Sequence, residues 1–203
     1  MISTEHFKAL FDPRAIVVAG ASTHPGKFGF VALHNILSCG YVGEVFATNR
    51  ERSEVLGRPT LADLTEVPDG VADLVFVCTP AASNPELLRQ AAAKGIRAVF
   101  IASAGYGESG EEGLALQSEL VDLANQLDLL IVGPNGQGLV STPSHLCAQI
   151  VAPYPPAGRI GIASQSGNFV SSFMNLSRQS GVGVSRAISV GNAAQVGVID
   201  MLE

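Results

Sequence analysis

The sequence lacks the features that mark several common classes of protein. Its three cysteines, Cys39, Cys78 and Cys147, lie far apart with no C-x-x-C spacing, which argues against a disulfide framework and against a zinc site. No apolar run approaches the roughly 18 residues of a membrane span, and the N-terminus shows no basic-then-apolar signal pattern. The formal net charge of −6 argues against broad nucleic-acid binding. We therefore expect a reduced, cytoplasmic protein without a metal site.

Charged residues are also scarce, at 15% of the chain, whereas 47% of the residues are hydrophobic and the mean hydropathy is +0.31. This composition suits buried parallel strands, which form continuous apolar runs. Runs of strand length, mostly separated by segments with helical spacing, occupy 15–20, 44–48, 72–78, 98–103 and 129–133. One helix is predicted to begin at "SGEE", with Ser109 as its N-cap and Glu112, three residues later, bonding back to the cap in a capping box. Gly40, Gly95 and Gly181 stand where helices should stop. The alternation of strand and helix predicts an α/β fold with a doubly wound parallel sheet.

A proline-rich stretch, "APYPPAG" at 152–158, divides the chain into units at 1–150 and 151–203. The second unit offers strands at 159–164 and 185–190, a helix at about 168–179 and the start of another helix at "VIDMLE". Two strands and about one and a half helices bury too little surface to close a core alone. We therefore interpret the second unit as the first part of a truncated domain, which leans on the first unit or on a partner chain.

The segment "VVAGASTHPGKFGF" (17–30) is typical of a strand entering a glycine-rich turn that holds a phosphate. It departs from the dinucleotide fingerprint G-x-G-x-x-G, because Ser22 stands where the second glycine belongs and the second strand ends in "ATNR" without an acidic residue. Lys27, Arg50 and Arg52 are expected to face one crevice at the carboxyl ends of the strands, which suits a ligand with several phosphates. No G-x-x-x-x-G-K-[ST] motif occurs. The loop alone leaves three interpretations open: a site for NADP, a site for coenzyme A, or a plain turn with surface cations.

Later motifs decide between these alternatives. They are "CTPAASNPELL" (78–88), "AGYGESGEEG" (104–113), "GPNGQG" (133–138) and "SQSGN" (164–168), each at or just beyond the end of an expected strand. Together with "GAS" at 20–22 and the closing "SVGNAAQVGVIDMLE", they resemble the CoA-binding half of the NDP-forming acyl-CoA synthetases. That family includes the ADP-forming acetate–CoA ligases and the alpha subunit of succinyl-CoA ligase. The resemblance covers nearly the whole chain.

The resemblance implies a CoA-binding Rossmann-like domain over 1–150, followed by the first part of a flavodoxin-like ligase domain over 151–203. It also implies a ligase that joins a carboxylic acid to coenzyme A while ATP becomes ADP and phosphate. In the family an acyl phosphate forms first, and its phosphate passes to a histidine of the second domain. An ATP-grasp domain or subunit then exchanges that phosphate with nucleotide, so ATP/ADP and Mg belong to the intact enzyme and are not bound by this chain.

The resemblance further assigns roles to individual residues. The CoA-binding positions are Gly20, Ala21, Ser22 and Lys27 for the phosphates, Thr48, Asn49 and Arg50 for the adenosine side, Thr79 and Pro80 against the adenine and pantetheine, and Ala104, Gly105, Glu108, Asn135 and Gly136 in the loops after the fourth and fifth strands. The phosphate-binding positions are Ser164, Ser166, Gly167 and Asn168. There, two hydroxyls and free N–H groups meet the positive end of a helix dipole.

The chain departs from the family pattern in ways that bear on catalysis. Gly136 stands where the family often has cysteine, and "ATNR" replaces V-N-P-K. The phosphohistidine has no counterpart among the four histidines, His6, His24, His34 and His145. We therefore expect no catalytic residue and no turnover in this chain alone.

Two other functional classes remain as alternatives: a non-catalytic regulatory module that binds CoA or a nucleotide, and an NADP-binding oxidoreductase domain. We expect a homo- or hetero-oligomer with an ATP-grasp domain or subunit as partner. The identity of the carboxylic acid, and whether the ATP-grasp part is fused or separate, stay open.

Overall fold

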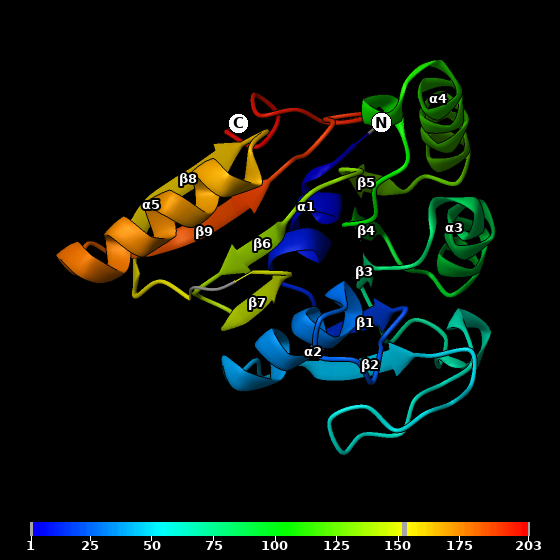
Figure 1. The fold of residues 1–203 in the computed structure, drawn as a ribbon, viewed down its shortest axis with the longest axis horizontal. Helices are drawn as coiled ribbons and strands as arrows, with labels where there is room; N and C mark the ends of the chain where they lie inside the picture. Colours follow the sequence, from blue (N-terminus) through cyan, green and yellow to red (C-terminus); the bar gives the residue numbers. More distant parts are fainter. Residues whose placement is uncertain (1, 152–153, 203) are drawn as a thin grey trace.

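A computed structural model describes residues 2–151 and 154–202 of the chain (Figure 1). Its helices are α1 (Thr4–Phe11), α2 (Phe28–Ser38), α3 (Asn84–Ala93), α4 (Glu111–Gln126) and α5 (Gly167–Ser180). Its strands are β1 (Ala15–Ala19), β2 (Glu44–Thr48), β3 (Leu74–Val77), β4 (Ala98–Ile101), β5 (Leu130–Val132), β6 (Gly138–Ser141), β7 (Leu146–Gln149), β8 (Ala157–Ser164) and β9 (Val184–Ser189). Three-residue 3₁₀ helices at Leu64–Glu66, Ala81–Ser83 and Gly107–Ser109 complete the described elements.

The first sheet contains five parallel strands in the order β2-β1-β3-β4-β5. Strands β1, β3, β4 and β5 are buried along their whole length, which explains why they appear in the sequence as unbroken apolar runs. Helices α3 and α4 cover one face, while α1, α2 and the second sheet cover the other (Figure 1). The predicted doubly wound parallel sheet is confirmed.

The second sheet has the order β7-β6-β9-β8 and is mixed. Strands β8 and β9 are parallel, whereas β6 runs antiparallel to both of its neighbours. The sequence analysis predicted β8, β9 and α5 but not the hairpin of β6 and β7. This hairpin supplies half of the sheet, so the strands around α5 have the partners that two strands alone would lack.

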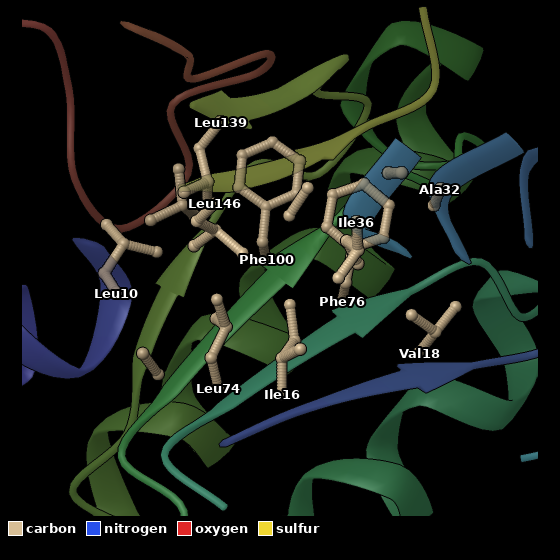
Figure 2. Close-up of a cluster of buried hydrophobic side chains, with 14 of the residues drawn as sticks. Leu10, Ile16, Val18, Ala32, Ile36, Leu74, Phe76, Phe100, Leu139 and Leu146 are labelled. Atoms are coloured by element: carbon tan, nitrogen blue, oxygen red, sulfur yellow. The ribbon is translucent and has the colours of Figure 1, made fainter. Parts of the chain in front are cut away.

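Both sheets share one apolar core (Figure 2). Alternate residues of β1 and β3, such as Ile16 and Phe76, point toward the second sheet because side chains alternate between the faces of a strand. Leu139 and Leu146 of the hairpin meet them from the opposite side. The rings of Phe76 and Phe100 stack between the layers with their centroids 5.2 Å apart. The two sheets are therefore packed together over one continuous apolar core.

Residues 191–195 attach the second unit to the free edge of β5. The N–H groups of Asn192 and Ala194 donate to the carbonyl oxygens of Pro134 and Gly133 at 2.9 and 3.0 Å. The side-chain amide of Gln195 accepts from the Ile131 N–H at 2.7 Å and donates to the Leu129 carbonyl at 3.0 Å. The Gln195 amide therefore bonds two backbone groups at the edge of the sheet, the Ile131 N–H and the Leu129 carbonyl, which a further strand would otherwise have to pair.

Three local features of the structure differ from the sequence analysis. The N-terminal helix α1 was not predicted. Helix α4 begins at Glu111 after Gly110, whose φ of 108° no other residue type adopts readily, so the proposed cap at Ser109 is wrong. Residues 198–202 form turns closed by i→i−3 hydrogen bonds and not the start of a helix. By contrast, Gly40, Gly95 and Gly181 follow helices with φ near +75°, as expected of stop positions.

Candidate functional site

A groove of about 750 Å³ lies where β1, β2 and β3 end. The strand order reverses between β1 and β3, and ligands of open α/β sheets bind at such a switch point. Eight of the residues assigned from the resemblance line this groove: Gly20, Ala21, Ser22, Thr48, Asn49, Arg50, Thr79 and Pro80. Three loops that are far apart in the sequence thus meet on one surface.

The loop after β1 requires glycine at two positions. Gly20 has φ of +83°, and a Cβ there would lie 3.0–3.1 Å from Thr79 and the backbone of Cys78. A Cβ at Gly29, in the first turn of α2, would lie only 2.0 Å from the Gly20 carbonyl oxygen. The start of α2 therefore rests directly against the loop. This close approach is the role of the last glycine in nucleotide-binding turns of this kind.

Asn49 fixes the loops after β1 and β2 to each other. Its Nδ2 donates to the Ala21 carbonyl at 2.9 Å, and its Oδ1 accepts from the Glu51 N–H at 2.9 Å. The Ala21 N–H in turn donates to the Thr48 carbonyl at 2.9 Å. The polar atoms of Asn49 are thus engaged in shaping the groove, a role that the sequence analysis did not anticipate.

The cations near the groove differ in availability. Arg50 is exposed in the groove lining, and within the described residues its guanidinium forms no ion pair or hydrogen bond. Arg52, which was expected to face the same crevice, is instead held by the Glu66 carboxylate. Lys27 is exposed at the N-terminus of α2, beyond the residues that line the groove. The expectation of three cations in one crevice is therefore corrected to one.

Backbone donors are also free at this site. The N–H groups of Ser22 and Thr23, both in the groove lining, have no partner among the residues that the structure describes. Unsatisfied N–H groups beside the N-terminus of a helix are the usual protein ligands of a phosphate. Together with Arg50 they form a region suited to an anion.

A buried polar network supports the third wall of the groove. Asn84 is fully buried at the start of α3 and accepts a hydrogen bond from the Thr79 hydroxyl at 2.8 Å. Its Nδ2 donates to the hydroxyls of Tyr106 at 2.7 Å and Ser103 at 3.3 Å. Asn84 therefore joins the loop after β3 to the loop after β4. The sequence analysis missed Asn84 and Tyr106, although the placement of an amide one residue before Pro85 at a helix start was a usable signal.

The remaining residues that the resemblance assigned to CoA binding lie after β4 and β5, outside the groove lining. Ala104 is exposed and Gly105 is half-buried. The Glu108 carboxylate accepts from the N–H groups of Gly105 and Tyr106 at 2.5 and 3.1 Å, and from Nδ2 of Asn192. Partial burial raises the pKa of Glu108, but these hydrogen bonds outweigh it and hold the pKa below its usual value. Glu108 thus shapes its own loop.

The loop after β5 contains one exposed and one buried position. Asn135 is exposed and lies 3.5 Å from the side-chain oxygen of Asn192. Gly136 is buried, and a Cβ there would lie 2.6 Å from the ring of Phe100 and 2.8 Å from the Ser189 carbonyl. The cysteine of the family pattern would not fit here without movement of the backbone.

The four residues that the resemblance assigned to phosphate binding lie together at the N-terminus of α5: Ser164, Ser166, Gly167 and Asn168. Ser166 caps the helix through its Oγ, which accepts from the Phe169 N–H at 3.3 Å, and the Ser164 Oγ accepts from the Ser166 N–H at 3.1 Å. Asn168 accepts from Gln137 at 2.9 Å. The N–H groups of Gly167 and Asn168 have no partner within the described residues. Backbone donors thus remain open at a helix start.

Among residues 2–151 and 154–202, no helix is both long enough and apolar enough to cross a membrane. Within the same residues, no group of three or more histidine, cysteine or acidic side chains is placed to hold a metal ion.

Comparison with known proteins gives matches to two domain families. Residues 14–142 match the family described as "CoA binding domain". The chain belongs to this CoA-binding domain family. Residues 157–203 match a second family, "Succinyl-CoA ligase like flavodoxin domain".

Similar proteins extend well beyond this CoA-binding domain. The alpha subunit of acetate–CoA ligase [ADP-forming] I of Pyrococcus furiosus is 35% identical over 200 residues, covering 97% of this chain and 43% of that protein. Acetate–CoA ligase [ADP-forming] I of Archaeoglobus fulgidus is 34% identical over 194 residues, covering 96% of this chain and 28% of that protein. The dinucleotide forming acetyl-coenzyme A synthetase 1 of Ca. Korarchaeum cryptofilum, solved with phosphate and ADP, superposes with a TM-score of 0.91 at 30% identity, covering 98% of this chain and 42% of that one. The chain thus spans less than half the length of these relatives.

Proposed function

We propose that the chain forms the CoA-binding portion of an ADP-forming acyl-CoA synthetase. Such an enzyme joins a carboxylic acid to coenzyme A while ATP becomes ADP and phosphate. The observation that carries the proposal is the groove after β1, β2 and β3, which gathers eight of the fourteen residues expected to bind CoA. Its volume of about 750 Å³ suits a nucleotide-sized ligand, since small-molecule sites range over about 300–1,000 Å³.

In this proposal different polar groups of the groove bind different phosphates of CoA. The free N–H groups of Ser22 and Thr23 bind the pyrophosphate, because they lie in the groove lining on the loop that leads into α2. Arg50 pairs with the ribose 3′-phosphate, since it is the cation in the groove lining. Thr79 and Pro80 form the wall for the adenine and pantetheine, with the Thr79 hydroxyl oriented by Asn84.

Residues outside the groove lining complete the site at the phosphates and along the pantetheine arm. Lys27 adds a second exposed cation at the start of α2. Ala104, Gly105 and Asn135 border the arm as it passes the ends of β4 and β5. Glu108 and Gly136 act indirectly, Glu108 by holding the backbone of its loop and Gly136 by close packing. Asn49 also acts indirectly, because it holds the loops that shape the groove.

The N-terminus of α5 serves as the phosphate site of the second unit in this proposal. The N–H groups of Gly167 and Asn168 bind the phosphate, and the hydroxyls of Ser164 and Ser166 hold the loop around it. The phosphohistidine and the ATP-grasp domain or subunit, with ATP and Mg, belong to other parts of a cytoplasmic, oligomeric enzyme. This chain alone is therefore expected to bind CoA and to show no turnover.

Calorimetric titration tests the identity of the ligand. We expect CoA to bind more tightly than NADP or NAD. Arg50→Ala should weaken CoA binding by about 1–3 kcal/mol, the range for a charge-assisted hydrogen bond. It should weaken dephospho-CoA binding less, because that ligand lacks the 3′-phosphate. Arg58→Ala is the matched control, since Arg58 is exposed on the same connection but lies outside the groove lining.

Two results would overturn the proposal. Tighter binding of NADP than of CoA would favour an oxidoreductase domain. Labelling of this chain by radioactive ATP would place the phosphoryl chemistry in these residues, contrary to the expectation that it requires a histidine outside this sequence. Equal losses of CoA and dephospho-CoA in Arg50→Ala would remove only the assignment of Arg50 to the 3′-phosphate.

A further inference from the structure

The last turn of α2 lies against β7 of the second sheet. Nδ2 of Asn35 donates to the carbonyl oxygens of Gln149 at 2.8 Å and Val151 at 3.1 Å. These two hydrogen bonds fix the position of the helix along the strand. They also join an element of the first unit to the hairpin on which the second sheet is built.

This alignment brings two cysteines together that lie 108 positions apart by their numbers, 39 and 147. Cys39 follows Asn35 by four residues, so it lies on the same helix face about 6 Å further along. Cys147 precedes Gln149 by two residues, so it lies on the same strand face about 6.6 Å away. Cys39 packs against the apolar cluster that contains Cys147, and each of the two thiols shifts the pKa of the other.

The two thiols have different surroundings. Cys39 is half-buried at the end of α2, whereas Cys147 is only 2% exposed. Interaction with the Cys147 thiol lowers the pKa of Cys39, against the opposing effect of its partial burial. Contact with Cys39 and burial raise the pKa of Cys147. Cys39 is therefore the accessible nucleophile, and Cys147 is the protonated neighbour behind it.

We propose that Cys39 and Cys147 form a redox-modification site in which a peroxide converts the thiol pair into a disulfide. The Cys39 thiolate attacks one oxygen of hydrogen peroxide, breaks the O–O bond and, after protonation, leaves a sulfenic acid and one water. The Cys147 sulfur then attacks the Cys39 sulfur, loses its proton and expels the hydroxyl as a second water. Two thiols and one peroxide thus give one disulfide and two waters.

The third cysteine provides an internal control. Cys78 follows β3 beside Gly20, on the groove side of the first sheet, and burial raises its pKa to about 12. A thiol that stays protonated and lies in a different part of the core is not expected to react. The new bond would join the end of α2, the helix that begins at the phosphate loop, to the second sheet. It would therefore lock together two elements that only packing and hydrogen bonds now connect.

The test uses the full chain treated with hydrogen peroxide, quenched and unfolded before its thiols are counted. The expected result is a fall from three thiols per chain to one, a cross-linked peptide pair containing Cys39 and Cys147, and recovery of all three thiols with dithiothreitol. The melting temperature of the oxidised chain should rise, because a bond closing a loop of this length restricts the unfolded state. Persistence of three thiols, a bond that includes Cys78, or a bond between two chains would overturn the proposal.

Variants assign the order of the two steps. In Cys147→Ala the sulfenic acid at Cys39 has no partner, so dimedone should trap it there. In Cys39→Ser the buried Cys147 should remain unlabelled. Dimedone labelling of Cys147 but not Cys39 would contradict the assigned roles. Peptide mapping of the wild-type chain decides whether the disulfide forms even if one of these variants fails to fold.

Discussion

Replacing Gly29 by alanine tests whether α2 has to touch the phosphate loop. The added Cβ would lie 2.0 Å from the carbonyl oxygen of Gly20 and 2.8 Å from its carbonyl carbon. Both are backbone atoms, so relief requires the helix or the loop to move by about 1–1.5 Å to an ordinary contact distance. Overpacking of this kind costs about 1–3 kcal/mol. We expect Gly29→Ala to lower the free energy of unfolding by that amount, measured by urea denaturation.

The same change should weaken ligand binding, because the displaced loop carries the free N–H groups of Ser22 and Thr23. A loss of about tenfold in CoA affinity corresponds to 1.4 kcal/mol, within the same range. Gly26→Ala is the matched control. A Cβ at Gly26 meets only the exposed side chain of His24 at 3.4 Å, so its stability and affinity should stay near those of the wild type. Wild-type stability and affinity in Gly29→Ala would refute the contact between helix and loop.

The first sheet and the groove could be predicted because they depend on patterns local to each strand. The run "AIVVA" of β1 is buried at all five positions, and such a strand is apolar throughout. Once parallel strands are inferred, the residues after β1, β2 and β3 must meet at one edge of the sheet. Arg50 could therefore be placed at this edge from strand order alone, whereas Thr79 was placed there by the family resemblance.

The features that were missed depend on contacts distant in the sequence. Strands β6 and β7 have four residues each, too few for periodicity to distinguish them from a loop after "GPNGQG". The pairing of Arg52 with Glu66 removes a cation from the groove, and only the course of the connection between β2 and β3 brings the two side chains together. The contact of Glu108 with Asn192 could not be foreseen for a similar reason, since the two residues are 84 positions apart.

Two further substitutions test electrostatic contacts within the fold. Asp73 accepts hydrogen bonds from the backbone N–H and guanidinium of Arg14; burial raises its pKa, but these bonds outweigh it and leave the pKa below the usual value. A lowered folded-state pKa means that the stabilisation is present above the unfolded pKa of about 3.9 and is lost as the pH falls through the folded value. Asp73→Asn should therefore cost about 1–2 kcal/mol at pH 7 and progressively less in acid, as measured by urea midpoints. Asn192→Asp places a second carboxylate where an amide now donates to Glu108. Two adjoining carboxylates cannot both ionise freely, so the pKa of one rises and the repulsion is complete only above that value. We expect Asn192→Asp to melt below Asn192→Ala at pH 8, because alanine removes the donor without adding charge. The gap should close as the pH falls and the pair takes up a proton. Equal melting temperatures at pH 8 with no dependence of the gap on pH would show that residue 192 does not contact Glu108, and that the second unit does not hold this loop in place.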